Sequence, residues 1–151
     1  MTAADQVRRV RNSGSFELPL PPDQAFPLFT ADGERKWVPG WSPTVLGPEP
    51  QHTGLVFLTQ SHGLDTIWTV IESDPAKRRH LYSRVTPGAS AGTVEVCVRP
   101  APQGSIVDVA YDLTALSEEG AAGLDSYEGE QFGAMMDKWR SLITDMLARG
   151  A

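Results

Sequence analysis

Apolar and polar residues alternate along much of the chain up to residue 113, which is the pattern of β-strands that bury one face. Near the start, the stretch Gly14-Ser-Phe-Glu-Leu18 places Phe16 and Leu18 on the same side of a strand predicted within residues 7–18. The clearest strand covers 105–113, and its apolar residues share one face. They are Val107, Val109, Tyr111 and Leu113, opposite Asp108, Ala110 and Asp112.

Turn signals rich in glycine and proline divide residues 44–113 into a series of short strands. Connections this short predict antiparallel neighbours, because parallel strands need crossovers of about a dozen residues. The predicted strands cover residues 44–46, 55–60, 66–72, 80–85, 93–99 and 105–113.

Two short helices are predicted between the first strand and this series. The segment from Pro21 to Phe29 begins with prolines, which suit the first turn of a helix. Pro27 lacks a backbone N–H and predicts a truncated or kinked helix. A second helical turn over 32–37 ends before Pro39-Gly40.

The C-terminal segment carries the strongest helical pattern, with an apolar stripe at intervals of three or four residues. Asp125-Ser-Tyr-Glu128 predicts a capping box at its start, and Gly150 predicts the C-cap of a helix of about 24 residues. The stripe must pack on the dry face of the sheet, the only large apolar surface predicted. It consists of Phe132, Met136, Trp139, Ile143 and Met146.

The chain has 151 residues, a length typical of one domain, and we expect a tail at 1–6 and a single domain over 7–151. A net charge of -6 argues against a nucleic-acid partner. The start lacks the apolar core of a signal peptide and no apolar run could cross a bilayer, so we expect a cytoplasmic protein without membrane insertion. The single cysteine, Cys97, predicts an inert packed thiol, and no metal or nucleotide motif is present, so no cofactor is expected.

This order of elements resembles the helix-grip fold of the START-like superfamily, which includes polyketide cyclases, the birch pollen allergen family and the activator of the heat-shock chaperone ATPase. The resemblance is closest to bacterial SRPBCC proteins of the polyketide cyclase/dehydrase-like kind and covers nearly the whole chain. It implies an α+β fold in which a curved antiparallel sheet wraps around the long helix, with an internal cavity between them. The matching segments are Phe16-Glu-Leu-Pro19, Asp23-Gln-Ala-Phe-Pro-Leu-Phe-Thr30, Gly33-Glu-Arg-Lys-Trp37, Thr66-Ile-Trp-Thr-Val-Ile-Glu-Ser-Asp-Pro75 and Met135-Met-Asp-Lys-Trp-Arg140.

In such a fold the two tryptophans around Pro39-Gly40 would lie near the mouth of the cavity. Trp37 is interpreted as a core residue, whereas Trp41 suits a cavity wall and a core plug equally well, because an indole ring offers wide apolar area and a polar N–H. The candidate ligand-binding residues are aromatic or soft side chains, as expected for an apolar pocket. They are Trp37, Trp41, Phe57, Trp68, Tyr82, Tyr111, Met135 and Trp139.

The facing of two strands stays open. In 66–71 both faces are apolar, so Trp68 could point either way. In 80–85, either Leu81, Ser83 and Val85 face inward or Tyr82 and Arg84 do. An inward Arg84 would be a charge in a dry cavity and therefore a functional candidate, but the solvent-facing interpretation is favoured.

Candidate catalytic residues are few. His62 and Asp65 could form an acid/base pair, although both are also natural turn residues, and the turn interpretation is favoured. The sequence Gly88-Ala-Ser-Ala-Gly92 fits the nucleophile elbow of α/β-hydrolases but is followed by a predicted strand, so it predicts a hairpin. His80 ends a basic cluster and is interpreted as exposed.

The leading functional hypothesis is therefore a module that binds a small hydrophobic molecule, lipid-like or aromatic, in the cavity. An alternative is a polyketide cyclase/dehydrase-like enzyme in which His62, Asp65, Tyr82, Arg84 or Tyr111 transfers protons or stabilises an oxyanion. A further alternative is a protein-interaction domain like the chaperone ATPase activator, although no surface in the sequence marks a protein partner.

Overall fold

The computed structural model describes residues 7–47 and 52–150, and the tail expected at 1–6 lies outside this part. The elements follow the predicted order, with short helices after the first strand and a long helix near the end. They are β1 (Arg9–Leu18), α1 (Pro22–Ala25), the 3-10 helices η2 (Phe26–Phe29) and η3 (Gly33–Lys36), β2 (Thr44–Val45), β3 (Val56–Ser61), β4 (Leu64–Asp74), β5 (Arg79–Thr86), β6 (Ser90–Ala101), β7 (Gly104–Ala115), α2 (Glu118–Gly123), the 3-10 helix η4 (Leu124–Tyr127) and α3 (Gly129–Ala148).

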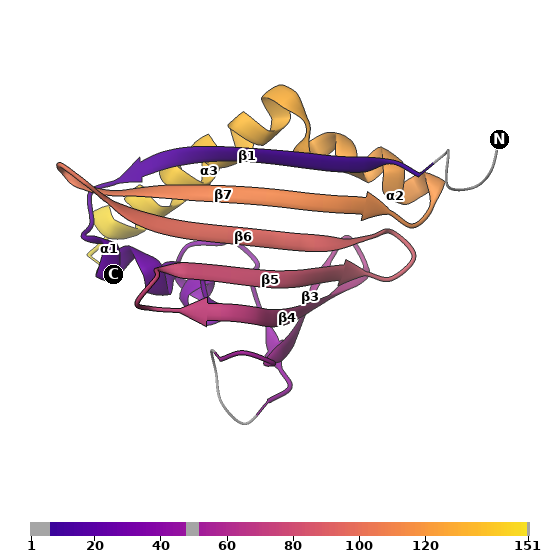
Figure 1. Cartoon of the computed structure of the whole chain (residues 1–151), viewed down its shortest axis with the longest axis horizontal. Coiled ribbons are helices and arrows are strands. Elements are labelled where there is room, and N and C mark those ends of the chain that lie inside the picture. The colour runs from indigo at the N-terminus through magenta and orange to yellow at the C-terminus, as the bar shows by residue number, and fades with distance from the viewer. Residues whose placement is uncertain (1–6, 48–51, 151) are drawn as a thin grey trace.

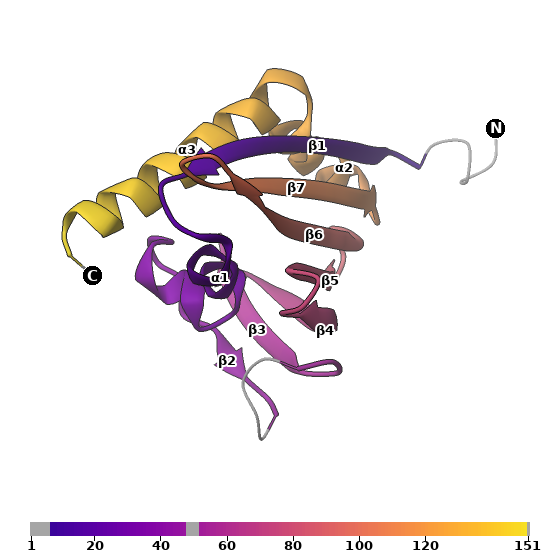
Figure 2. The same cartoon turned by 60° about the vertical axis from the view of Figure 1, so that its left-hand side comes forward.

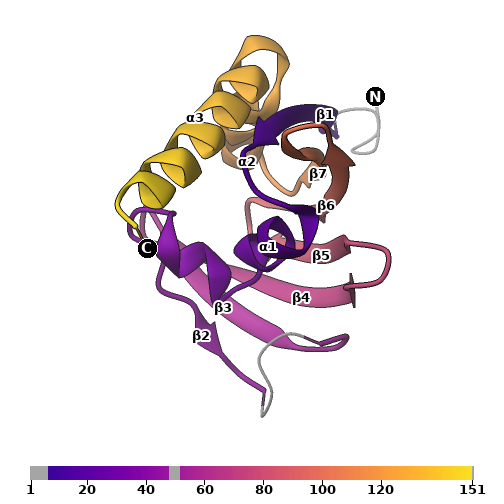
Figure 3. The same ribbon diagram turned by 90° about the vertical axis from the view of Figure 1, so that its left-hand side faces the viewer.

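The strands form one antiparallel sheet in the order β1-β7-β6-β5-β4-β3-β2 (Figure 1). The sheet curves, so that β1 and β7 lie near α3 while β3 and β2 lie at the opposite end (Figures 2 and 3). Alternate residues of each strand face the concave side, which carries most of the buried core. The predicted α+β helix-grip fold is therefore confirmed.

Helix α3 packs most directly on β1, at Gly14. A β-carbon at Gly14 would lie 3.1 Å from Cγ of Met136 and 3.2 Å from Cε1 of Phe132, so these two side chains would have to shift to admit a larger residue. Near the middle of α3, Trp139 contacts Phe16 of β1 and Trp37 after η3, with ring centroids 6.5 and 5.6 Å apart. The C-terminal part of the helix extends past the short helices (Figures 2 and 3). The helix thus joins the sheet to the short helices.

The short helices are held by a close approach of backbone to backbone. A β-carbon at Gly33 would lie 1.9 Å from the carbonyl oxygen of Pro27, so only glycine fits where η3 crosses η2. Pro27 limits helix α1 to four residues, and the chain continues as the tighter η2, as its missing N–H predicted. This arrangement of the chain buries Phe29 and Trp37 against Trp139 of α3.

The predicted capping box of the long helix is wrong. Helix α3 has 20 residues and begins at Gly129, and its N-cap residue Glu128 makes no side-chain capping bond. Asp125 and Glu128 instead form ion pairs with Arg8, at 2.7 and 2.9 Å. Gly150 adopts a φ of 75° at the end of the helix, as predicted for a C-cap.

His80 is not exposed, which corrects the prediction from its basic cluster. Its exposed fraction is 0%, its ring stacks on Phe26 with centroids 3.9 Å apart, and its Nε2–H donates to the Phe26 carbonyl at 2.9 Å. Its Nδ1 accepts from the Ser73 hydroxyl at 3.0 Å, which fixes the neutral tautomer. Burial lowers the pKa of His80 to about 4.

Candidate functional site

The strand register places Arg84 on the concave face, in one row with aromatic side chains. Trp68 is paired with Phe57 of β3 on one side and with Arg84 of β5 on the other, so all three point to the same face. Tyr82 lies two residues earlier on β5 and is buried on that face. The interpretation of Arg84 as solvent-facing is therefore wrong, and the alternative with Tyr82 and Arg84 inward holds.

A pocket of about 740 Å³ opens between this face and the loop that follows η3. The sheet contributes Arg84, Trp68 and Thr66 to its lining, and the loop contributes Trp41. The rest of its lining consists of Val38, Pro39, Gly40, Ser42, Thr44, Leu58, Thr59, Gln60, Ser61 and Asp65.

The aromatic wall of the pocket is held in place by its own polar atoms. The indole N–H of Trp41 donates to the Ala31 carbonyl at 2.7 Å, and that of Trp68 donates to Oγ1 of Thr59 at 3.0 Å. Trp68 stacks on Phe57 with centroids 5.8 Å apart, and Trp41 meets both rings edge-on at 6.1 and 6.2 Å. The N–H groups are satisfied, so these rings can offer apolar surface to a ligand.

Arg84 is half-buried and is held by aromatic groups. Its Nη2 donates to the Tyr127 hydroxyl at 3.2 Å, and its guanidinium carbon lies 5.6 Å from the Trp68 ring centroid and 5.7 Å from that of Tyr127. Within residues 7–47 and 52–150, no carboxylate forms an ion pair with it. Several N–H donors of its planar fork remain for another acceptor.

Tyr127 is positioned from outside the cavity by strand β1. Asn12 donates to the Tyr127 carbonyl at 3.1 Å, and the ion pairs of Arg8 with Asp125 and Glu128 hold η4 on both sides of Tyr127. The Tyr127 ring stacks on Tyr111 of β7, with centroids 5.1 Å apart. Burial raises the pKa of the Tyr111 hydroxyl above its ordinary value, and nearby Tyr127 and Glu34 raise it further.

Glu34 is a site residue that the sequence analysis missed. In a 3-10 helix, residues three apart eclipse one another, so Glu34 shares the inward face of η3 with Trp37. The side chain is half-buried, and burial of its carboxyl group raises the pKa to about 8. Among the described residues, no hydrogen bond or ion pair compensates this carboxyl group. The spacing between Glu34 and the buried Trp37 was the signal in the sequence that could have identified it.

The remaining ligand-binding candidates pack in or against the core and do not line this pocket. Trp37 is 4% exposed and donates to the Leu28 carbonyl at 2.8 Å, which confirms its core interpretation. Tyr82 donates to the Phe29 carbonyl at 2.6 Å. Met135 and Trp139 are half-buried against the core, and Trp139 also contacts Tyr111 with centroids 6.4 Å apart.

His62 and Asp65 lie at the β3–β4 hairpin, and only Asp65 is among the lining residues of the pocket. His62 has a φ of 52° and is exposed, as the turn interpretation predicted. Asp65 accepts from Nε2 of Gln60 at 2.7 Å, and no bond joins it to His62 in the part of the chain described. The segment Gly88–Gly92 forms the β5–β6 hairpin, with Thr86 paired to Ser90, so it is not a nucleophile elbow.

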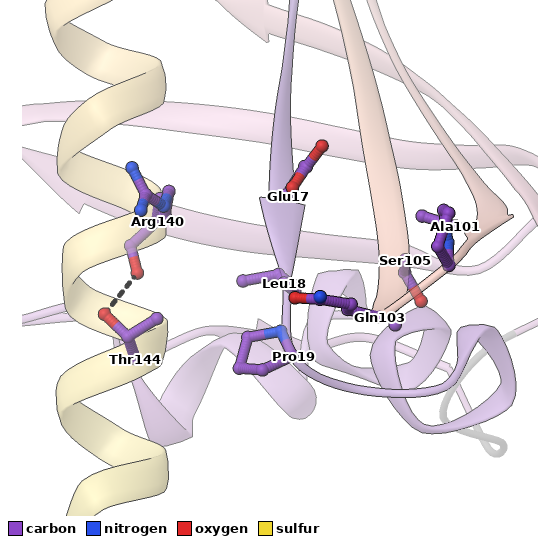
Figure 4. Close-up of a pocket in the computed structure, with 10 residues that line it drawn as sticks. Glu17, Leu18, Pro19, Ala101, Gln103, Ser105, Arg140 and Thr144 are labelled. Carbon is purple, nitrogen blue, oxygen red and sulfur yellow. Dashed lines mark hydrogen bonds between the residues drawn. The ribbon is translucent and has the colours of Figure 1, made fainter.

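Two further hollows are surface features. One, of about 560 Å³, lies between the end of β1, the β6–β7 hairpin and α3, where Arg140 and Glu17 are exposed (Figure 4). Another, of about 570 Å³, lies on the outer face of the sheet over residues such as Leu81 and Thr93. Neither has the aromatic wall of the pocket at Trp41 and Trp68.

Residues 9–146 match the model of a protein family described as polyketide cyclase / dehydrase and lipid transport. The chain belongs to this family. No curated protein matches its sequence. The structure describes no cluster of three or more potential metal ligands and no helix long and apolar enough to cross a membrane within residues 7–47 and 52–150.

Several solved structures share the fold of this family member at low sequence identity. Norcoclaurine synthase from Thalictrum flavum is 12% identical, with a TM-score of 0.65 over 95% of this chain and 92% of its own. Ara h 8.0201 is 13% identical, with a TM-score of 0.65 over 94% and 99% of the two chains. A protein from Rhodobacter sphaeroides is 15% identical, with a TM-score of 0.66 over 96% and 99%. At these identities the similarity shows the fold alone.

Proposed function

We propose that this protein binds a small hydrophobic molecule, lipid-like or aromatic, in the pocket between the concave face of the sheet and the loop after η3. The observation that carries the proposal is the volume of this pocket, about 740 Å³, with Trp41 and Trp68 in its lining and no lining residue from α3. Ligand pockets for small molecules usually have volumes of roughly 300–1,000 Å³ and combine apolar walls with a few placed polar groups. Membership of a family described by cyclase, dehydrase and lipid transport activities supports the same reading.

The free energy of binding would come mainly from apolar surface. Burial contributes about 25 cal/mol per Å² before the costs of association are deducted. The rings of Trp41, Trp68 and Phe57 are already ordered by their contacts with one another, so a ligand would not have to order them. This preorganisation favours a flat, unsaturated or aromatic body.

Replacing Trp41 by alanine is expected to weaken the binding of the uncharged probe N-phenyl-1-naphthylamine by roughly tenfold, which corresponds to about 1.4 kcal/mol. The reason is the loss of a ring that lines the pocket and meets Trp68 edge-on. The dissociation constant is measured from the increase in probe fluorescence.

Leu116→Ala is the matched control, because Leu116 is 52% exposed and is not part of the pocket lining. Equal affinities of wild type and Trp41→Ala, or an equal loss in Leu116→Ala, would move the binding site away from this pocket. Thermal unfolding of each variant verifies that it is folded.

A second candidate function is acid/base catalysis by the groups beside Tyr111, and Glu34 favours it. A carboxyl group with a pKa of about 8 near the Tyr111 hydroxyl can exchange a proton at neutral pH. A binder returns its ligand unchanged, whereas an enzyme releases a molecule of different mass. Native mass spectrometry after incubation with a hydrophobic cell extract distinguishes the two by the masses of the released molecules.

A further inference from the structure

We propose that the molecule bound in the cavity is an amphipathic anion, whose acidic head group pairs with Arg84 and Tyr127 while its apolar body lies on Trp68 and Trp41. The inference deepens the proposed function and rests on it. It names the class of ligand, an acid such as a carboxylate or sulfonate with an aromatic or lipid-like body.

The first argument is that Arg84 differs from the other strand arginines of the described chain. Those on the outer face of the sheet each have a carboxylate partner. The pairs are Arg9 and Arg11 with Asp112, Arg79 with Glu72 and Glu95, and Arg99 with Asp108. Arg84 faces the cavity without one. Its two ring contacts and one tyrosine hydroxyl bring no negative charge to the guanidinium group, so they stabilise the cation only partly.

The second argument is that a ligand can reach the guanidinium group. Arg84 is one of the lining residues of the pocket, together with Trp68, and it is half-buried. The Trp68 ring on one side and the Tyr127 ring on another orient the group, and Tyr127 is itself held by Asn12. An oriented planar fork in a partly dry site binds an oxyanion more strongly than a mobile surface charge does.

The third argument is that no acidic side chain of the surrounding elements occupies Arg84, since none of the described carboxylates forms an ion pair with it. These elements carry Glu34 on η3, Asp65 at the start of β4 and Asp125 on η4, and Asp125 is paired with Arg8. Burial raises the pKa of Glu34 to about 8, so its neutral form dominates at pH 7 and does not repel an anion. Asp65 is exposed and accepts a hydrogen bond from Gln60. The hydroxyl of Tyr111, the other titratable group of the cavity named above, is neutral because its pKa is raised.

Two probes with the same aromatic skeleton test the inference. 8-Anilinonaphthalene-1-sulfonate is N-phenyl-1-naphthylamine with an added sulfonate group. Arg84→Met is expected to weaken binding of the sulfonate probe by roughly tenfold to hundredfold, the range for losing hydrogen bonds to a charged group, and to change binding of the neutral probe by less than about threefold. Arg84→Lys, which keeps the charge but not the fork, is expected to lie between wild type and Arg84→Met.

Arg140→Met is the matched control, because Arg140 is exposed and lines the separate hollow against α3 (Figure 4). A loss of sulfonate binding in Arg140→Met instead of Arg84→Met would overturn the inference, as would an equal loss of both probes in the Arg84 variants. An equal loss of both probes would leave the proposed function, binding of a hydrophobic molecule in this pocket, intact. If the wild type bound neither probe, the proposed function itself would be rejected, and the inference with it. Thermal unfolding of each variant distinguishes lost binding from lost folding. If Arg84→Met does not fold, the affinities of Arg84→Lys for the two probes provide the test.

Discussion

Replacing Glu34 by glutamine is expected to stabilise the protein by roughly 2–4 kcal/mol at pH 8, and by much less near pH 4.5. The folded-state pKa of Glu34 is about 8, whereas the ordinary value is 4.5. A raised pKa means that the stability contribution of this group is fully present below pH 4.5 and is lost as the pH rises toward 8. Glutamine does not ionise and avoids this loss, and the upper limit is reduced because the half-buried side chain retains some contact with water.

The measurement is the free energy of urea unfolding of wild type and Glu34→Gln between pH 4.5 and about pH 9. The difference between the two free energies should grow from pH 4.5 to about pH 8 and level off above it. Glu17→Gln serves as the control, because Glu17 is exposed on β1. A difference that does not vary with pH would show that the Glu34 carboxyl group is solvated in the folded protein.

A second large effect is expected at His80 and runs in the opposite direction. Its folded-state pKa is about 4 against an ordinary 6.5, so the stability contribution of the neutral ring is fully present above pH 6.5 and is lost as the pH falls to 4. The loss amounts to about 3 kcal/mol. When the ring is charged, Nδ1 carries a proton and can no longer accept the hydrogen bond from the Ser73 hydroxyl.

Comparison with His80→Gln isolates this effect. The variant is expected to be less stable at pH 7.5, because it loses the stacking on Phe26, but the gap should narrow by about 3 kcal/mol toward pH 4. His52→Gln, at an exposed position, should parallel the wild type. A constant gap between wild type and His80→Gln across this range would contradict the assignment of a buried neutral ring. Between pH 4.5 and 6.5, a rising pH lowers the stability through Glu34 and raises it through His80. The difference in unfolding free energy between wild type and each variant therefore isolates the effect of one group.

The strands and the long helix could be predicted from the sequence because each has one strongly apolar face. The alternation in 105–113 correctly predicted which side chains of β7 are buried. The apolar stripe from Phe132 to Met146 correctly predicted α3. Helix α2 was missed because the segment Glu118–Gly123 is rich in glycine and alanine and has no apolar stripe. Its start is marked only by Ser117, whose hydroxyl accepts from the Gly120 N–H at 3.0 Å.

The residues that give the site its chemistry were harder to predict. Charged side chains usually face water, so the facing of Arg84 and the enclosure of Glu34 depend on contacts with segments distant in the sequence, such as Tyr127 and Tyr111. His80 was misassigned for the same reason, since its partner Phe26 lies 54 residues away. The aromatic wall at Trp41 and Trp68 was predicted as a set of residues, although the facing of Trp68 was not.

The most direct test of binding in the cavity is the ¹⁵N NMR spectrum of the indole N–H groups during titration with N-phenyl-1-naphthylamine. The chain has four tryptophans, so each signal can be assigned by one substitution. The signals of Trp41 and Trp68 are expected to shift most, because these two residues line the pocket, and that of Trp37, which bonds to Leu28 in the core, is expected to shift least. Saturation of the protein by the probe with no shift at Trp41 or Trp68 would contradict a binding site in the pocket between the concave face of the sheet and the loop after η3.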